Sequence, residues 1–321
     1  MNFNNLRYFL EVAQDLSFTK AAQKLYMSQQ SLSSHIGRLE QEFGVRLFER
    51  SPRLKLTHAG RCVADLASRI IDLEDQMERQ IADIGNQRKG FLAIGASHTR
   101  GRVFLPEVLP LYVRRYPHVE FQLQTGISKV LEASLLQGEL DLIVAFTPID
   151  NENISTVPVL TERFCAVIPQ EILDAVFPNS RQAAAHFFEK GIDITPFCEQ
   201  PFLLLERKNR LRDMADRYLK AEGIAPNILL ESADVETLIA LCFKGMGITF
   251  SFETFARKCL SVAEQKGSGS AHIFPVGGGT NSDIVLAYRK DRYLSKAAKD
   301  FIALSLEVFG GTGGGGAEKY Q

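Results

Sequence analysis

The sequence predicts an α/β protein in which a small helical domain and one long helix precede a two-lobed α/β domain. Three observations support this division. In residues 1–88, apolar side chains recur every three or four positions, as on one face of a helix. From residue 91 onward, short apolar strands alternate with helical patterns, which is typical of parallel α/β units. The intervening residues 85–90 are polar and bounded by glycines, so we interpret them as a hinge.

Composition and charge limit the possible functions. The chain has 321 residues, of which 45% are hydrophobic and 23% are charged, an ordinary globular balance that allows large packed cores. The net charge of −1 argues against a protein coated in basic residues. The charge is unevenly placed, because residues 1–60 carry eight Lys or Arg and five Asp or Glu, which gives +3 there and −4 elsewhere. A positive domain on a neutral body is expected of a DNA-reading module.

The sequence also indicates where the protein works. Its first residues lack the basic run and apolar core of a signal peptide, and no stretch approaches the length of a membrane span. The five cysteines are scattered and lack Cys-x-x-Cys spacing, so we interpret them as free thiols. We therefore expect a cytoplasmic protein with no membrane partner, no metal site and no cofactor.

Residues 17–43 predict two helices joined by a turn. Ser17 and Ser28 are suited to cap the two helices, and Tyr26 lies in the turn between them. The apolar positions of both helices repeat at helical spacing: Phe18, Ala21, Ala22, Leu25, Leu32, Ile36, Leu39 and Phe43. The second helix has a polar face made of Gln29, Gln30, Ser33, Ser34 and Arg38. Such a face suits the reading of base edges and phosphates, whereas an ordinary helical hairpin remains the alternative.

A basic hairpin is predicted directly after these helices. Residues 44–57 form two short segments, and Arg50, Arg53 and Lys55 lie at or near the tip between them. A basic hairpin beside a recognition helix is a wing, placed to reach phosphates or an adjacent minor groove. The wing makes an ordinary helical hairpin a much poorer interpretation.

Residues 3–60 resemble the winged helix-turn-helix of LysR-type transcriptional regulators. The matching motifs are Leu6-Arg-Tyr-Phe9, Ser17-Phe-Thr-Lys-Ala-Ala22, Ser28-Gln29, Leu32-Ser33, Ile36, Leu39-Glu40, Gly44-Val-Arg-Leu-Phe-Glu-Arg50, Leu56-Thr57 and Gly60. The sequence departs from the family at Gln30, where proline is common, and at Ser34, where arginine is common. The resemblance implies that the double-stranded DNA of an interrupted inverted repeat is contacted by Thr19, Ser28, Gln29, Gln30, Ser33, Ser34, Arg38, Arg50, Arg53 and Lys55.

A long helix is predicted over residues 58–88. Its apolar positions are Val63, Leu66, Ile70, Leu73, Met77, Ile81 and Ile84, a near-heptad series between charged flanks. So narrow a seam is typical of a two-stranded coiled coil and favours a homodimer through this helix. A core helix packed within one chain is the alternative. The linker helix of the LysR family occupies the same position, and the family resemblance extends the expectation to a homotetramer.

Residues 91–309 predict two similar α/β lobes, with lobe I formed by 91–160 and 271–309 and lobe II by 161–270. The chain crosses twice between them, once in a Thr, Pro and Asn-rich stretch at 147–158. This is the architecture of periplasmic binding proteins, and the effector domain of the LysR family is built in this way. A helical pattern at 181–190 has no assigned function, and the glycine-rich tail at 310–321 is expected to be flexible.

In such two-lobed folds, a ligand binds between the lobes, at the carboxyl ends of strands and the starts of the following helices. The resemblance places there Ser97, His98, Thr99, Arg100, Ser128, Phe146, Thr147, Leu205, Glu206 and Phe250. Hydroxyls and free N–H groups at a helix start suit an anion, and Arg100 and Arg207 suggest a carboxylate effector, which Glu206 would oppose. The alternative is that Ser97 and Ser128 only cap helices.

The predicted function is that of a sequence-specific DNA-binding transcriptional regulator controlled by a small molecule. RNA polymerase is a further expected partner if the protein activates transcription. A cytoplasmic small-molecule binding protein whose helical N-terminus serves only assembly is the alternative, which the basic wing opposes. The sequence offers no metal cluster, catalytic triad spacing or phosphate loop, so we do not expect an enzyme.

Overall fold

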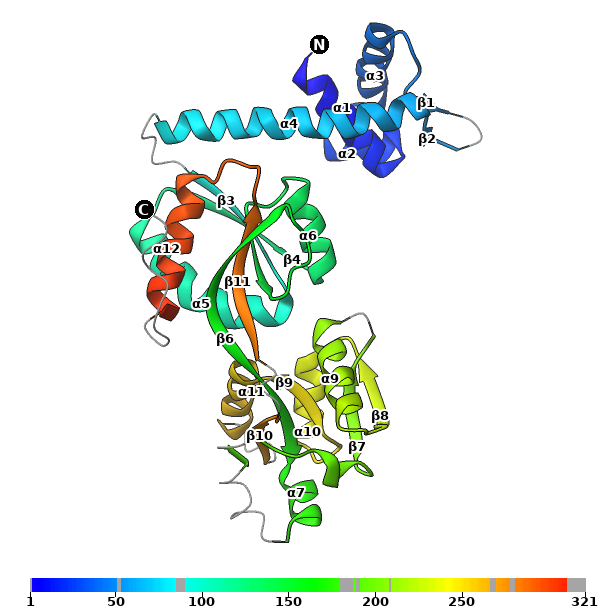
Figure 1. The fold of residues 1–321 in the computed structure, drawn as a ribbon. Helices are drawn as coiled ribbons and strands as arrows, with labels where there is room; N and C mark the ends of the chain where they lie inside the picture. The colour runs from blue at the N-terminus through cyan, green and yellow to red at the C-terminus, as the bar shows by residue number, and fades with distance from the viewer. Residues whose placement is uncertain are drawn as a thin grey trace. The chain divides into compact units, whose positions relative to one another are not determined.

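The computed structural model describes residues 2–50, 53–84, 90–178, 187–188, 191–207, 209–265, 270–277 and 281–310. The chain divides into two compact units (Figure 1). The first contains residues 1–90 together with 291–296, and the second contains 91–290 and 297–321. The predicted helix at 181–190, apart from 187–188, and the predicted flexible tail beyond residue 310 lie outside the described residues.

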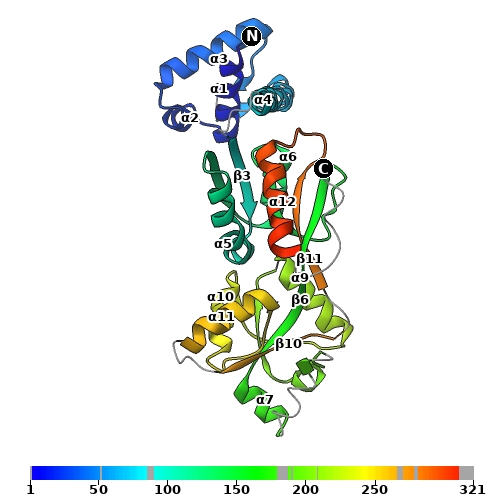
Figure 2. The same cartoon turned by 90° about the vertical axis from the view of Figure 1, so that its left-hand side faces the viewer.

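The first unit begins with three helices, α1 (Phe3–Asp15), α2 (Phe18–Lys24) and α3 (Gln29–Phe43). Ser17 Oγ accepts from the Lys20 N–H at 3.3 Å and Ser28 Oγ from the Ser31 N–H at 3.1 Å, so both predicted caps are confirmed. The helices close over one apolar core, which includes Leu6, Phe9, Ala21, Ala22, Leu32, Ile36 and Leu39. Figure 2 shows α1, α2 and α3 grouped together.

The wing consists of β1 (Phe48–Glu49) and β2 (Lys55–Leu56), which pair antiparallel. Its base is fixed to the recognition helix, because Glu40 Oε1 accepts from the N–H groups of Leu47 at 2.8 Å and Phe48 at 3.2 Å. The helix that follows the wing passes close to the backbone at Leu47. A Cβ added at Gly60 would lie 2.1 Å from the Leu47 carbonyl oxygen, so this crossing requires glycine.

Helix α4 (His58–Ile84) forms the long helix, and Thr57 Oγ1 caps it by accepting from the Gly60 N–H at 2.9 Å. Its predicted apolar seam divides into two parts. Val63 and Ile70 are half-buried against the core of their own unit. The remaining described members are exposed: Leu66, Leu73, Met77 and Ile81. The core-helix alternative therefore holds for one side of α4, against which α1 packs. The exposed side leaves the coiled coil as a prediction.

One turn of α4 also carries charged contacts within the first unit. Asp72 lies 3.0 Å from Arg292, an ion pair whose side chains are both buried although the two atoms lack hydrogen-bond alignment. The same segment is held further along α4, where Asp83 accepts from the Tyr293 hydroxyl at 3.0 Å and from the Lys296 N–H at 2.8 Å. Arg7 of α1 reaches the neighbouring Asp75 at 2.7 Å. These contacts fix segment 291–296 and α1 on α4.

The second unit contains both lobes. Lobe I comprises β3 (Gly90–Ala96), α5 (His98–Arg115), β4 (Val119–Thr125), α6 (Ser128–Leu136), β5 (Leu142–Phe146), β11 (Asn281–Arg289) and α12 (Lys296–Gly310). β3 pairs parallel with β5, which in turn pairs antiparallel with β11. The Tyr112 hydroxyl donates to the Ala297 carbonyl at 2.9 Å and joins α5 to α12.

Strand β6 (Ile154–Pro169) runs through both lobes (Figure 1). Its first half pairs with β11 in lobe I, and its second half pairs with β9 (Thr249–Phe252) and β10 (Ala271–Pro275). The predicted irregular crossing at 147–158 was therefore wrong from Ile154 onward. Pro158 lies next to a bulge in the register with β11, which explains why this part did not look like a strand.

Lobe II contains β6's second half, β9 and β10, and the parallel pair β7 (Pro201–Leu205) and β8 (Asn227–Ser232). Its helices are α7 (Gln170–Val176), α9 (Arg210–Ala221), α10 (Val235–Cys242) and α11 (Glu253–Gln265), with a 3-10 turn η1 (Thr195–Phe197). The pairing of β10 with residues 165–169 places 271–275 in lobe II, which corrects the predicted assignment of this strand to lobe I. The lobes touch where Lys258 of α11 donates to the Arg102 carbonyl of α5 at 2.7 Å.

Candidate DNA-binding surface and effector site

The polar face of α3 is directed to solvent. Gln29, Gln30, Ser34 and Arg38 are exposed and Ser33 is half-buried, whereas the opposite side of the helix enters the core. The Thr19 hydroxyl donates to Gln29 Oε1 at 3.1 Å, which joins the start of α3 to α2. Ser28 is exposed as well, but its hydroxyl is occupied by the helix cap. The face therefore presents amides, a hydroxyl and one guanidinium, the groups that read base edges.

The wing carries its predicted cations, all exposed. Arg50 lies over the Phe18 ring at 5.4 Å and 3.7 Å from Glu40, and Lys55 lies 4.0 Å from Glu49. Arg53 forms no ion pair with any residue in the described part of the chain. Exposed pairs of this kind contribute at most about 1 kcal/mol, so they leave the cations available to phosphates.

The turn between α2 and α3 holds a residue that sequence reasoning did not assign to the surface. Tyr26 is 98% exposed and has a φ of 52°, a left-handed conformation that is unfavourable for a side chain other than Gly, Asn or Asp. Tyr26 comes shortly before α3 in the sequence, next to the residues that form the polar face of that helix. Its place in the turn was the only sequence signal for it.

At the lobe boundary, the starts of α5 and α6 lie side by side, because the Gly126 N–H donates to the Ala96 carbonyl at 3.4 Å. Ser97 and Ser128, one at each start, are half-buried. The helix-cap alternative is wrong for both hydroxyls. Ser97 makes no cap hydrogen bond and instead accepts from Arg100 Nη1 at 3.2 Å, and the cap position of α6 is occupied by Ile127.

Arg100 is the best-supported candidate at this boundary. Its side chain is only 7% exposed, and its guanidinium lies 3.6 Å from the centre of the Phe146 ring. The Phe146 ring in turn contacts the tilted ring of Phe252 of lobe II, with ring centres 4.0 Å apart, and the Phe146 carbonyl accepts from Arg210 of α9 at 2.7 Å. Burial and then the nearby Arg210 lower the pKa of Arg100 to about 9, against the opposing charges of Glu162 and Glu132.

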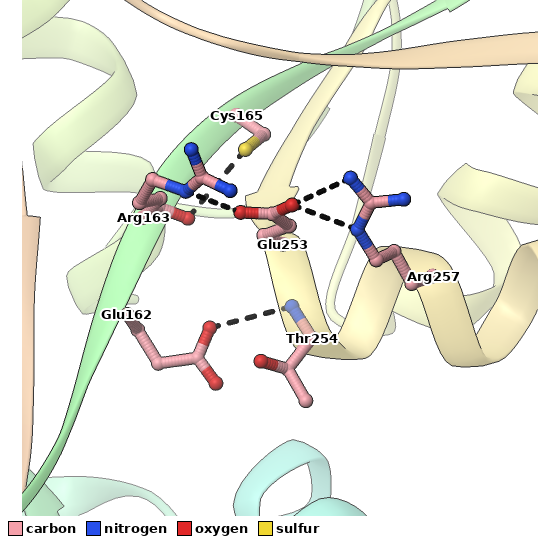
Figure 3. A network of polar contacts seen from close by, with 6 residues as sticks. All are labelled: Glu162, Arg163, Cys165, Glu253, Thr254 and Arg257. Atoms are coloured by element: carbon pink, nitrogen blue, oxygen red, sulfur yellow. Dashed lines mark hydrogen bonds and ion pairs between the residues drawn. The ribbon is translucent and has the colours of Figure 1, made fainter. Parts of the chain in front are cut away.

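Two carboxylates near the lobe junction, Glu162 of β6 and Glu253 of α11 (Glu253–Gln265), differ in their partners (Figure 3). Glu253 lies 2.5 Å from Arg163 and 2.6 Å from Arg257. Burial would raise the pKa of Glu253, but the hydrogen bonds from Arg257 and Arg163 outweigh it and lower the pKa. Glu162 is 3% exposed and accepts from the Thr254 N–H at 3.4 Å. Burial raises the pKa of Glu162, with the hydrogen bonds from Thr254 opposing that shift.

The remaining candidates are placed unevenly. His98 is exposed and Thr99 half-buried in the first turn of α5, and Glu206 is exposed after β7, next to the buried Leu205. The Thr147 backbone and side chain are bonded to Asp283 and Ser282 of β11. Phe250, also predicted for the effector site, is buried in lobe II between Phe164 and Phe202, at 5.4 and 6.2 Å between ring centres.

Sequence reasoning missed Arg210, Glu162 and Phe252. The signal for Glu162 was available, since it is a lone carboxylate in an otherwise largely apolar strand. Arg210 is the first residue of α9 and follows the cap residue Asn209. His98 holds the same position in lobe I, as the first residue of α5 after Ser97. Neither signal reveals that packing buries the side chain.

The described part of the chain contains no group of three or more His, Cys, Asp or Glu residues placed to hold a metal ion. Among its helices, none is long and apolar enough to cross a membrane.

An exposed reading helix with a basic wing, followed by a two-lobed α/β domain, defines a regulator that binds DNA through one unit and carries a separate ligand-binding domain. The chain belongs to the LysR family of bacterial transcriptional regulators. Residues 3–61 match the family model for the bacterial regulatory helix-turn-helix protein of the lysR family, and residues 85–310 match the LysR substrate-binding domain. The protein is therefore a LysR-type DNA-binding transcriptional regulator with an effector-binding domain.

Sequence relatives agree with this family, and solved structures share the fold. The chain is 30% identical over 314 residues to the uncharacterized HTH-type transcriptional regulator YcgK of Bacillus subtilis, covering 96% of this chain and 94% of that protein. It is 28% identical to a probable RuBisCO transcriptional regulator of Gracilaria tenuistipitata var. liui, covering 95% and 96%. Its fold is similar to full-length OxyR from Pseudomonas aeruginosa, with a TM-score of 0.66 at 23% identity over 96% and 94% of the two chains. It is also similar to CbnR solved with its target DNA, with a TM-score of 0.60 at 20% identity over 96% and 99%.

Proposed function

We propose that this regulator reads an interrupted inverted repeat in double-stranded DNA with the exposed face of α3. The observation that supports the proposal is the division of α3, which buries its apolar side and presents Gln29, Gln30, Ser34 and Arg38 to solvent. In this assignment, amide and guanidinium groups contact base edges. Arg50, Arg53 and Lys55 of the wing contact phosphates or the adjacent minor groove, and Thr19 and Ser28 position the start of the helix.

The dimer is proposed to form through α4. Four large apolar side chains are exposed along one side of this helix, and Leu73 alone is 63% exposed. A second α4 would remove them from water and would place two reading helices on one palindromic site. A homotetramer, built from two such dimers, would then match the two halves of an interrupted repeat.

The effector is proposed to be a small carboxylate bound at the lobe boundary. The start of α5 combines free backbone N–H groups, the Ser97 hydroxyl and the buried Arg100 guanidinium, which together favour an anion. A ligand that prefers one arrangement of the lobes would shift the regulator between two states on DNA. We place this activity in the cytoplasm, with RNA polymerase as a partner where the regulator activates transcription.

The test uses the full chain and a random pool of double-stranded DNA. Rounds of selection followed by gel shift should yield an inverted repeat with a spacer, and its affinity should fall steeply as the salt concentration rises. Selection of no common sequence, together with weak binding that is equal for all duplexes, would contradict the proposal. A protein in which the helical N-terminus serves only assembly would give that result.

A further inference from the structure

The lobe boundary contains a buried cation without a carboxylate partner. Arg100 forms no ion pair with any residue that the structure describes, and its Nε has no hydrogen-bond partner. The guanidinium is held in place by Ser97 and by the face of Phe146. Arg210, which donates to the Phe146 carbonyl, adds to the positive field. A buried, incompletely paired guanidinium is costly, and an anionic ligand at the start of α5 would offset that cost.

A buried carboxyl group lies in the same neighbourhood. Glu162 forms no ion pair with the described residues, and its side chain accepts from the Thr254 N–H at the start of α11. Figure 3 shows the Glu162 carboxyl directed away from the Arg163, Glu253 and Arg257 cluster. Glu253, by contrast, has two arginine partners. Glu162 is therefore the carboxylate at this junction that still has capacity for a cationic group.

A chain of contacts joins Arg100 to Glu162. The Arg100 guanidinium lies over Phe146, and Phe146 contacts Phe252 with ring centres 4.0 Å apart. Phe252 is two residues before Thr254, whose N–H donates to Glu162. Arg100 belongs to lobe I, and Glu162 lies on the strand that continues into lobe II, where α11 contacts α5. The negative charge of Glu132 on α6 also favours the charged form of Arg100. A molecule that carries both a negative and a positive group could satisfy Arg100 and Glu162 together.

We propose that the effector is a small zwitterion of the α-amino acid class, with its carboxylate at Arg100, Ser97 and the start of α5 and its ammonium group at Glu162. This inference rests on the effector site proposed above and adds the cationic half of the ligand. Arg100 and Glu162 recognise opposite charges. A simple carboxylate would leave Glu162 without a partner, and a simple amine would leave Arg100 without one.

The test begins with thermal shift of the full chain against the proteinogenic L-amino acids. For the amino acid that stabilises the protein most, calorimetry then compares two matched analogues. One lacks the ammonium group, as propionate does relative to L-alanine, and the other lacks the carboxylate, as L-alaninamide does. We expect each analogue to bind about tenfold to 100-fold more weakly, because each leaves one buried charge unmatched.

Variants assign the two halves of the ligand. Glu162→Gln keeps the shape of the side chain and should lose the preference for the amino acid over its des-amino analogue. Arg100→Lys keeps the charge and should weaken both ligands, with Arg100→Gln weakening them further if its melting curve shows a folded protein. Glu139→Gln, an exposed change in lobe I, is the matched control and should leave both affinities unchanged.

Three results would overturn the zwitterion. These are binding of no amino acid, equal binding of the des-amino analogue, and an amino acid affinity that Glu162→Gln leaves unchanged. Sequence-specific DNA binding by the same preparation would show that the regulator itself stands while the effector class is wrong. If the wild-type protein instead shows no sequence-specific DNA binding, the proposed function is contradicted.

Discussion

The DNA-reading surface and the lobe boundary use charged side chains in opposite ways. On α3 and the wing, the cations are exposed and held in water, where removing one leaves no buried group without a partner. At the lobe boundary, Arg100 and Glu162 are both buried and have few partners. A third place, the Asp72–Arg292 pair on α4, shows that this chain can pair buried charges directly. If both proposed sites are right, exposed charges serve DNA binding and poorly paired buried charges serve ligand binding, whereas the Asp72–Arg292 pair lies within the first unit.

The largest expected effect concerns the exposed apolar side of α4. Leu73→Asp combined with Met77→Asp would bury two carboxylates in the proposed dimer interface, at about 3–5 kcal/mol for each uncompensated charge. Light scattering should show a lower mass than that of the wild type, because the α4 dimer is lost from the proposed tetramer. Ser68→Asp places a carboxylate at another exposed position of the same helix and should leave the mass unchanged. An unchanged mass in the double variant would mean that α4 does not form the dimer.

Removing one partner of a buried ion pair should cost nearly as much. Asp72→Ala leaves Arg292 buried without this carboxylate, and we expect the free energy of unfolding of the first unit to fall by about 3–5 kcal/mol. Denaturant titration gives the value, and Glu78→Gln is the control, because it removes an exposed carboxylate from the same helix. Equal stability of the two variants would contradict a stabilising role for this pair.

A change on the reading face should alter recognition without altering stability. Gln29→Ala is expected to reduce discrimination at one base position by about 1–3 kcal/mol, while stability changes by no more than about 0.5 kcal/mol. A binding-site selection profile measures the first quantity. Gln41→Ala, exposed near the end of α3, serves as the control. If both variants select the same sequences as the wild type, Gln29 does not read a base.

Glu162→Gln should stabilise the protein in a pH-dependent way. Burial raises the pKa of Glu162 in the folded state, so its folding contribution is fully present below the ordinary value of 4.5 and is lost as the pH rises through the raised value. The neutral glutamine avoids that loss, and we expect the variant to gain on the order of 1 kcal/mol at neutral pH. Urea titrations across pH should show the gain vanishing in acid. If the variant and the wild type differ in free energy of unfolding by the same amount at every pH, the ionisation of Glu162 does not cause the difference.

The smallest expected effect on free energy comes from the wing. Arg53→Ala should weaken binding to all duplexes alike and reduce the slope of log affinity against log salt by about 1, because one phosphate contact is lost. Gel shifts at several salt concentrations measure the slope. Gln29→Ala should leave that slope unchanged, so the two variants separate backbone contact from base reading. A base-specific loss in Arg53→Ala would point to insertion in the minor groove instead.

Much of the first unit follows from local sequence. Ser17 and Ser28 cap helices because a serine hydroxyl reaches the free N–H groups of the next turn, and that geometry needs no distant partner. The apolar spacing of α3 similarly determines which side faces solvent once one side is buried. The apolar seam of α4 could be recognised from the sequence, but not which of its residues face the core of their own unit. Only the packing of α1 shows that Ile70 is covered and Leu73 is not.

The sequence by itself determined the family, the reading helix, the wing and the order of the two lobes, because each depends on spacing and caps within a few turns of chain. The tertiary structure supplied the contacts on which the proposed effector site rests. The pairing of β10 with β6 assigns β10 to lobe II, and Phe250 packs in the core of that lobe. The tertiary structure also brought together Arg100, Arg210 and Glu162, which lie far apart in the chain. Burial gives these charges their importance, and burial depends on which distant segments pack over a side chain.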